Sequence, residues 1–138
     1  MPVYSVTTHA PLSKMHKEKM VHAITDLHCG LTGAPEQFVH VLFSDGLPLK
    51  PGIEVYVHAN TRANRPKELV AKVGQQLIND TAMALDISTE QVQIKMLEIQ
   101  ASWIMEGGKI MPEPGEEGPW MEAMKRELEA YNKNRVEA

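Results

Sequence analysis

The residues of this chain best suited to chemistry are a proline at its start and two arginines near its middle. Pro2 follows a methionine that is normally removed before so small a residue, so we expect a mature chain that begins with a secondary amine. A free α-amino group has a pKa of about 8, and burial or nearby cations bring that pKa into the range useful for proton transfer. If Met1 is retained, the nitrogen of Pro2 is an amide without base chemistry.

The two arginines, Arg62 and Arg65, lie in the stretch TRANRP at 61–66, directly before a predicted helix. Free backbone N–H groups and the helix dipole favour an anion at such a position. Guanidinium groups hold carboxylates through paired hydrogen bonds. The pair therefore predicts a receptor for the carboxylate of a small organic acid.

The lengths of the first two predicted elements place His28 at the same site. The β-prone stretch 2–8 rises about 20 Å as a strand, at about 3.3 Å per residue. A helix from Ser13 returns about 1.5 Å per residue and regains the level of Pro2 near His28. If the third strand runs antiparallel to the first, its exit TRANRP reaches this end as well. We therefore expect the proline, the histidine and the arginines to lie together.

The elements that position these residues form a duplicated unit. A shift of 54 residues aligns identical pairs: Val3 with Val57, Ile24 with Ile78, Asp26 with Asp80, Leu31 with Leu85, Glu36 with Glu90 and Gln37 with Gln91. Apolar periodicity predicts, in each half, a strand, a helix and a second strand: 2–8, 13–31 and 38–43, then 53–60, 66–85 and 91–98. The nearly continuous apolar run FVHVLF at 38–43 is typical of a strand buried on both faces.

Two β-α-β units predict an α/β (α+β) fold with a four-stranded sheet and both helices on one face. No remaining element is large enough to cover the other face, so a symmetric oligomer is the simplest cover. We treat 1–138 as one domain, with halves at 2–45 and 53–98. The arm at 99–138 contains a Gly- and Pro-rich connection and then a short helix, with one apolar stripe that packs on the body or on a neighbouring subunit: Trp120, Met124, Leu128 and Tyr131.

Composition excludes several functional classes. The chain has 14 Lys and Arg against 18 Asp and Glu, a net charge of −4, which argues against nucleic acid as a partner. It has no apolar run of about 20 residues and no signal-peptide pattern, so we expect a cytoplasmic protein without a membrane partner. Cys29 is the single cysteine, which excludes an internal disulfide. The six histidines show no metal-binding spacing, so we predict no metal.

The initial Met-Pro, the two β-α-β halves and the arginine-bearing loop together resemble the tautomerase superfamily. Three stretches are most similar to its cis-3-chloroacrylic acid dehalogenase group: AITDLHCGLTG at 23–33, RANR at 62–65 and MEGGKIMPEPGEEGPW at 105–120. The resemblance covers nearly the whole chain. It implies a homotrimer that uses no cofactor, with an amino-terminal proline as catalytic acid or base.

The resemblance also implies roles for individual residues. In that group the proline works with a histidine on the first helix, two arginines that hold the substrate carboxylate, and a glutamate and a tyrosine that activate water. These roles fall on Pro2, His28, Arg62, Arg65 and Glu106. Lys95 occupies the place of the tyrosine; it can hold an anion, but it cannot reproduce the hydrogen bonding of a phenol. Enol–keto chemistry, which needs chiefly Pro2 and the arginines, is therefore favoured over hydrolytic dehalogenation.

Three functional hypotheses follow. The first is a cofactor-independent tautomerase that acts on small 2-oxo or enol acids of the phenylenolpyruvate type. The second is a hydrolase or hydratase of 3-halo or unsaturated three-carbon acids, with Glu106 as the base. The third is a non-catalytic interaction protein that keeps the fold, which retention of Met1 would favour.

Overall fold

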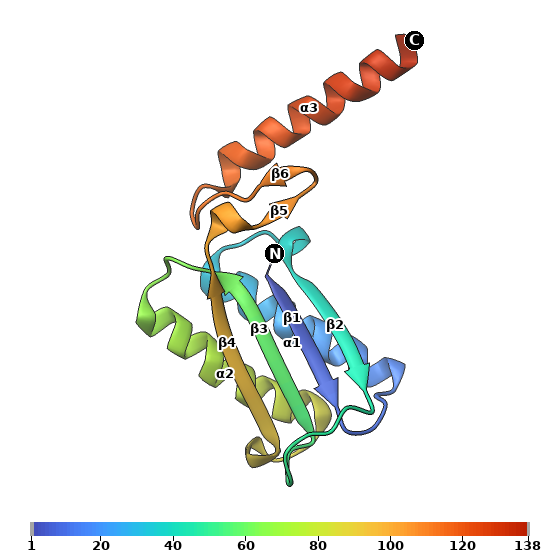
Figure 1. Ribbon diagram of the computed structural model, residues 1–138, viewed down its shortest axis with the longest axis vertical. Coiled ribbons are helices and arrows are strands. Elements are labelled where there is room, and N and C mark those ends of the chain that lie inside the picture. The colour runs from blue at the N-terminus through green and yellow to red at the C-terminus, as the bar shows by residue number, and fades with distance from the viewer. Residues whose placement is uncertain (1, 138) are drawn as a thin grey trace.

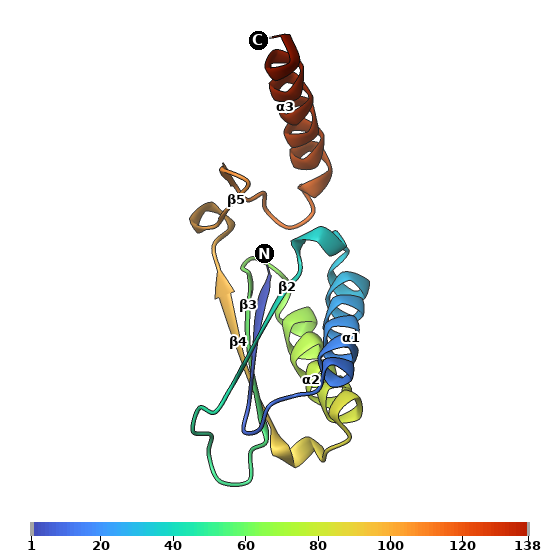
Figure 2. The same ribbon diagram turned by 90° about the vertical axis from the view of Figure 1, so that its right-hand side faces the viewer.

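The computed structural model describes residues 2–137 and contains a four-stranded mixed sheet, two helices on one of its faces, and a C-terminal extension at one end (Figures 1 and 2). The main elements are β1 (Val3–Thr8), α1 (Lys14–Thr32), β2 (His40–Asp45), β3 (Val55–Arg62), α2 (Lys67–Leu85) and β4 (Val92–Ile99). The strand order is β2-β1-β3-β4. The inner pair β1 and β3 is antiparallel and both outer pairs are parallel. The predicted pair of β-α-β units is therefore confirmed.

The core lies between the sheet and the two helices, and its spacing explains why these segments form these elements. Alternate residues of the inner strands, such as Tyr4, Val6 and Val57, are buried toward the helices. Buried residues of α1, including Met20 and Ile24, pack against them at helical spacing. Burial of one such side chain contributes about 1.5–3 kcal/mol, so this packing fixes where along the sheet each helix residue lies.

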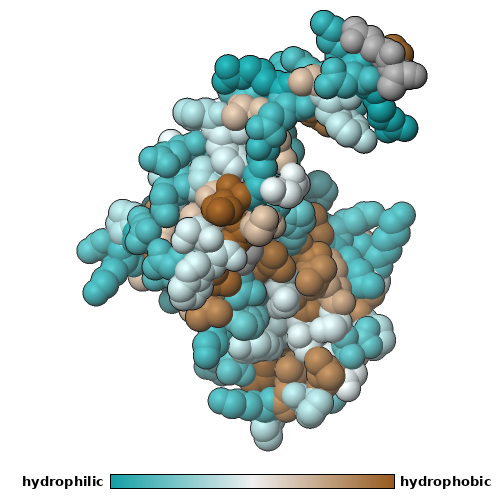
Figure 3. All heavy atoms as spheres, turned by 45° about the horizontal axis from the view of Figure 1, so that its top comes forward, coloured by the Kyte–Doolittle hydropathy of each residue, from teal (hydrophilic) through white to brown (hydrophobic). Residues whose placement is uncertain are grey.

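The opposite face of the sheet is left uncovered by residues 2–137. On this open face, Leu42 of β2 and Leu97 of β4 are 59% and 42% exposed, and apolar side chains lie among polar ones (Figure 3). The prediction that 38–43 forms a strand buried on both faces is wrong in the single chain. Phe38 ends a 3-10 turn, and β2 is an edge strand whose outward side chains have no cover.

The C-terminal extension contains more structure than its Gly- and Pro-rich sequence predicts. A short hairpin joins β5 (Met105–Glu106) to β6 (Lys109–Ile110). Its two central residues, Gly107 and Gly108, have φ angles of 59° and 76°, the left-handed conformation that glycine adopts without strain. The final helix α3 (Glu117–Glu137) has 21 residues, so the prediction of a short helix is wrong.

A second, smaller core joins this extension to the sheet. Phe38, Ala101, Ile104 and Met111 are buried together, and Trp120 and Met121 at the start of α3 pack against them. The rest of α3 projects away from the body (Figures 1 and 2). Its apolar stripe is thus split, because the first turns pack on the body while Leu128 and Tyr131 stay exposed. No helix within residues 2–137 is long and apolar enough to cross a membrane.

Candidate active site

His28 lies beside the start of β1, as the lengths of the strand and the helix predict. Helix α1 begins after Ser13, whose hydroxyl accepts a hydrogen bond from the backbone N–H of His16 at 3.1 Å. Four turns later, His28 faces the sheet and is only 1% exposed. Its ring Nδ1 lies 2.7 Å from the hydroxyl of Tyr4, the second residue of β1.

The surroundings of His28 keep its imidazole neutral. Burial, followed by the positive charges of Arg65 and Arg62, lowers the pKa of His28 from 6.5 to about 3. Burial also raises the pKa of Tyr4, so the phenol stays protonated at neutral pH. The ring Nε2 of His28 is buried and has no hydrogen-bond partner in the described part of the chain. An unmade bond of this kind costs about 1–3 kcal/mol, so Nε2 is poised to meet a ligand or a water.

A small cavity of about 10 Å³ lies next to His28. Its polar lining comes from His28, Thr32, Thr61 and Arg65, and α2 and β4 supply apolar walls. This volume holds about one water molecule. It therefore has room beside the imidazole for one small group, such as a water molecule or a single oxygen atom of a ligand.

Arg62 ends β3 and is 1% exposed. Its Nη1 donates to the carbonyl of Pro112 at 2.5 Å, and its Nη2 forms an ion pair with the carboxylate of Glu117. The second oxygen of Glu117 accepts from the backbone N–H of Gly115 at 2.9 Å. Burial alone would raise the pKa of Glu117, but the hydrogen bond from Arg62 holds it below its usual value. Arg62 thus already holds a carboxylate, that of the chain's own C-terminal extension.

Arg65 is half-buried in the loop before α2 and donates one hydrogen bond to the carbonyl of Arg62 at 3.2 Å. Burial and the neighbouring Arg62 charge lower its pKa, and Tyr4 and Glu117 act in the opposite sense. Among residues 2–137, no carboxylate lies within salt-bridge distance of Arg65. Of the two arginines, Arg62 is thus paired with a carboxylate of the chain itself, whereas Arg65 is hydrogen-bonded to a backbone carbonyl.

Pro2 and Glu106 lie at the same end of the sheet. Pro2 is buried, and its carbonyl accepts a hydrogen bond from the backbone N–H of His40 at 2.9 Å. The ring Nε2 of His40 lies 3.3 Å from Oε1 of Glu106. Through His40, the hairpin of the extension thus brings its glutamate next to the start of the chain's first strand.

Within one chain, Lys95 does not lie at the end of the sheet where Pro2 and Glu106 are found. It lies opposite His58 in the middle of β4, exposed on the open face of the sheet. The residue level with Val3 is Asn60, whose partner on β4 is Leu97. The structure thus gathers Pro2, His28, both arginines and Glu106 at one end, and leaves the lysine apart from them.

Three further residues of the site were not predicted: Tyr4, His40 and Glu117. Each acts as a partner for a predicted residue across a long sequence separation. The alternation of β1 would have placed Tyr4 toward the helices, but nothing local pairs it with His28. No group of three or more His, Cys, Asp or Glu side chains in the described residues is arranged to hold a metal ion.

Comparison with known proteins places this geometry in a family. No protein-family model matches the chain, and no curated protein sequence does. A solved member of the cis-3-chloroacrylic acid dehalogenase family is 27% identical, with a TM-score of 0.82 over 94% of this chain and 99% of its own. Native fused 4-OT shares the fold at 20% identity, with a TM-score of 0.72 over 79% of this chain and 95% of its own.

A malonate semialdehyde decarboxylase shares the fold at 15% identity, with a TM-score of 0.65 over 77% of this chain and 89% of its own. These relatives include enzymes of several activities on one scaffold, so the fold alone does not choose among them. With its two β-α-β units, its mixed sheet and this likeness along almost its whole length, the chain belongs to the tautomerase superfamily.

Proposed function

We propose that the protein is a cofactor-independent tautomerase that moves a proton between oxygen and carbon of a small 2-oxo or enol carboxylic acid. The observation that carries the proposal is the neutral, buried imidazole of His28 with its unpartnered Nε2 beside Arg65. A neutral imidazole can polarise a carbonyl or enol oxygen, and a neighbouring guanidinium can hold the acid group. Both lie at the end of the sheet where Pro2 enters β1.

In the proposed reaction Arg65 binds the substrate carboxylate. After removal of Met1, the secondary amine of Pro2 takes the enol O–H proton. The oxygen then forms a carbonyl, and the electron pair of the C=C bond takes a proton at C3 from the protonated amine. In the proposed mechanism Tyr4 is the donor to Nδ1 of His28, which lies 2.7 Å away, so that Nε2 carries the hydrogen and stabilises the developing charge on the substrate oxygen. Atoms and charge balance without any further reactant.

Replacement of Pro2 tests the mechanism. Positioned proton transfer contributes about 10²–10⁴-fold, so Pro2→Ala is expected to lose most of the ketonisation rate with phenylenolpyruvate. Intact mass must show that both proteins have lost Met1, which makes the two chains comparable. Equal rates would refute the proline mechanism, and a wild-type mass that retains Met1 in the native host would favour a non-catalytic role.

A hydrolytic dehalogenase is the second candidate, favoured by the position of Glu106 beside His40 and by the likeness to a member of the cis-3-chloroacrylic acid dehalogenase family. It would require Glu106 to activate water. Chloride release from cis-3-chloroacrylate that disappears in Glu106→Gln supports this candidate. No release from protein with a free Pro2 counts against it.

We also propose that the protein is a homotrimer. Solved structures of fused 4-OT proteins are described as an asymmetric trimer in one case and a symmetric trimer in another. The exposed apolar residues on the open face of the sheet are the surface that such an assembly would bury. A neighbouring subunit could also bring its Lys95 to a site, because the lysine lies on that same face.

A further inference from the structure

One edge of the Arg62 guanidinium has only half of its hydrogen bonds made. Arg62 is 1% exposed, its Nη1 donates to the carbonyl of Pro112, and its Nη2 donates to one carboxylate oxygen of Glu117. Its Nε is buried and has no hydrogen-bond partner within residues 2–137. Nε and Nη2 lie on the same edge of the planar group. That edge therefore carries one satisfied donor and one unsatisfied donor.

A separate carboxylate matches this edge better than Glu117 does. The two oxygens of a carboxylate can accept from Nε and Nη2 at once, which is the paired arrangement that arginine forms with acids. Glu117 instead divides its oxygens, because one accepts from Arg62 and the other accepts from the backbone N–H of Gly115 at 2.9 Å. A buried donor without a partner is unfavourable, so a ligand that satisfies both N–H groups has an advantage over Glu117.

The segment 112–117, which we call the strap, holds Arg62 in this state. The two ends of the strap, Pro112 and Glu117, both bind the guanidinium. Between them, the carboxylate of Glu113 accepts a hydrogen bond from the side-chain amide of Asn64 at 3.1 Å. The strap is thus attached to the loop before α2, where the candidate arginines lie.

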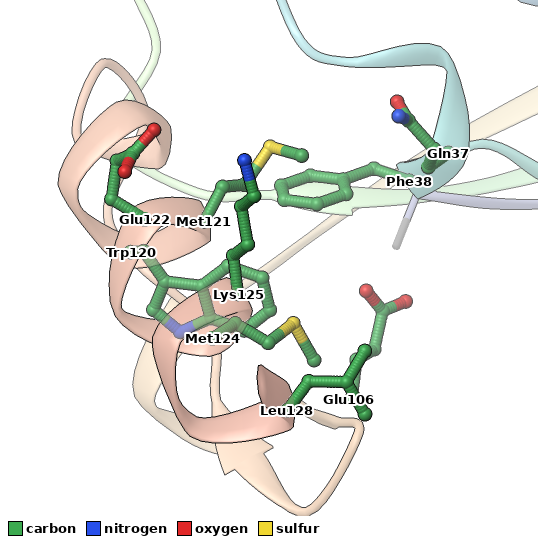
Figure 4. Close-up of a pocket in the computed structure, with 9 residues that line it drawn as sticks. All are labelled: Gln37, Phe38, Glu106, Trp120, Met121, Glu122, Met124, Lys125 and Leu128. Atoms are coloured by element: carbon green, nitrogen blue, oxygen red, sulfur yellow. The ribbon is translucent and has the colours of Figure 1, made fainter. Parts of the chain in front are cut away.

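The second core anchors the chain on both sides of the strap. Met111 is buried in this core, and Trp120 packs against it. The indole N–H of Trp120 donates to the carbonyl of Ile110 at 2.8 Å, and its ring meets that of Phe38 edge to face. Figure 4 shows the ring of Phe38 extending toward the first turns of α3. Release of Glu117 can therefore be confined to the strap, while α3 stays on the body.

The charges at the strap act on the residues of the proposed reaction. Burial, followed by the charges of Arg65 and Arg62, lowers the pKa of His28. Burial and Arg62 lower the pKa of Arg65, and Glu117 acts in the opposite sense. Arg62 thus lies within electrostatic reach of both groups, and Glu117 lies within reach of Arg65. An acid that arrives at Arg65 enters the field that Glu117 now balances.

We propose that Glu117 is an internal competitor for the carboxylate of the substrate, and that the strap closes the Arg62 edge until an acid displaces it. This inference rests on the proposed function, because it treats Arg62 as a second contact for the acid that Arg65 binds. Exchange of one carboxylate for another keeps the buried guanidinium compensated, whereas a neutral molecule would leave its charge without a partner. The strap therefore opens for acids and stays closed to neutral compounds of the same shape.

Removal of the competing charge tests the inference. Calorimetric titration with propanoate, an unreactive acid, compares wild type with Glu117→Gln and with Glu116→Gln, a control at an exposed neighbour. We expect Glu117→Gln to lower the Kd for propanoate at least about tenfold, because a closed site binds more weakly in proportion to the fraction of molecules that are open. Glu116→Gln should match wild type.

Propanamide, the neutral counterpart of propanoate, separates charge from space. Its affinity should be the same for wild type and for Glu117→Gln. An equal gain for the acid and the amide would mean that Glu117 only fills space, and it would overturn the inference. An unchanged or raised Kd for propanoate in Glu117→Gln would overturn it as well.

Wild type alone provides a test that does not depend on the folding of a variant. In the closed state the backbone N–H of Gly115 donates to Glu117, so saturating propanoate should speed its exchange with solvent, measured by NMR. The indole N–H of Trp120 should keep its exchange rate. If propanoate binds and the exchange of Gly115 does not change, Glu117 stays on Arg62 and the inference fails, whether or not an enol is turned over. If both tests succeed and phenylenolpyruvate is not converted, the internal competitor stands and the proposed tautomerase function fails.

Discussion

At the residue scale, His28 links the site to stability. Its pKa is about 3 in the folded protein against 6.5 ordinarily, so between these values the unfolded chain binds a proton that the folded chain does not. The contribution of His28 to the free energy of unfolding is therefore complete above about pH 6.5. It declines as the pH falls toward 3, by up to about 1.4 kcal/mol per pH unit.

The measurement is urea unfolding between pH 4 and pH 7 for wild type and for His28→Asn. The variant is expected to show a weaker loss of unfolding free energy toward acid. His22→Asn, an exposed histidine on the same helix, is the control and should follow wild type. If His28→Asn and wild type lose stability in parallel, the histidine is not held neutral by the fold.

At the scale of elements, the ion pair between Arg62 and Glu117 attaches the start of α3 to the end of β3. Removal of one partner leaves a buried charge uncompensated, which costs about 3–5 kcal/mol. Glu117→Ala is therefore expected to lower the free energy of unfolding by about this amount in urea titrations. Glu116→Ala, an exposed neighbour, should change it by less than about 0.5 kcal/mol. Similar values for the two variants would mean that the pair does not hold the extension.

The strands and helices themselves could be predicted from the sequence, but the contacts between distant elements could not. The strands and helices of the two halves follow from apolar spacing, and the position of His28 follows from element lengths, since both are set locally. The β5–β6 hairpin carried its own signal in the adjacent Gly107 and Gly108. The sequence contains no such signal for the ion pair between Arg62 and Glu117, because 55 residues separate the two and only the packed second core brings them together.

At the scale of the whole molecule, the proposed homotrimer would bury the open face of the sheet. Leu97 is exposed there, while Met83 is exposed on α2 on the helical side. We expect Leu97→Glu to convert a trimer into monomers, because a carboxylate in the interface would be buried without a partner. Met83→Glu should leave the trimer intact. Molar mass by light scattering checks both, and a trimeric Leu97→Glu protein would place the interface elsewhere.

The packing of Pro2 has a practical consequence for anyone who produces or labels this protein. Pro2 is buried at the end of the sheet, and its carbonyl is hydrogen-bonded to His40 of β2. An affinity tag joined ahead of Pro2 would therefore crowd the candidate site. The far end of α3 is the place for a purification handle, a fluorophore or a surface attachment, because this helix projects away from the sheet (Figure 1) and Val136 near its end is 88% exposed.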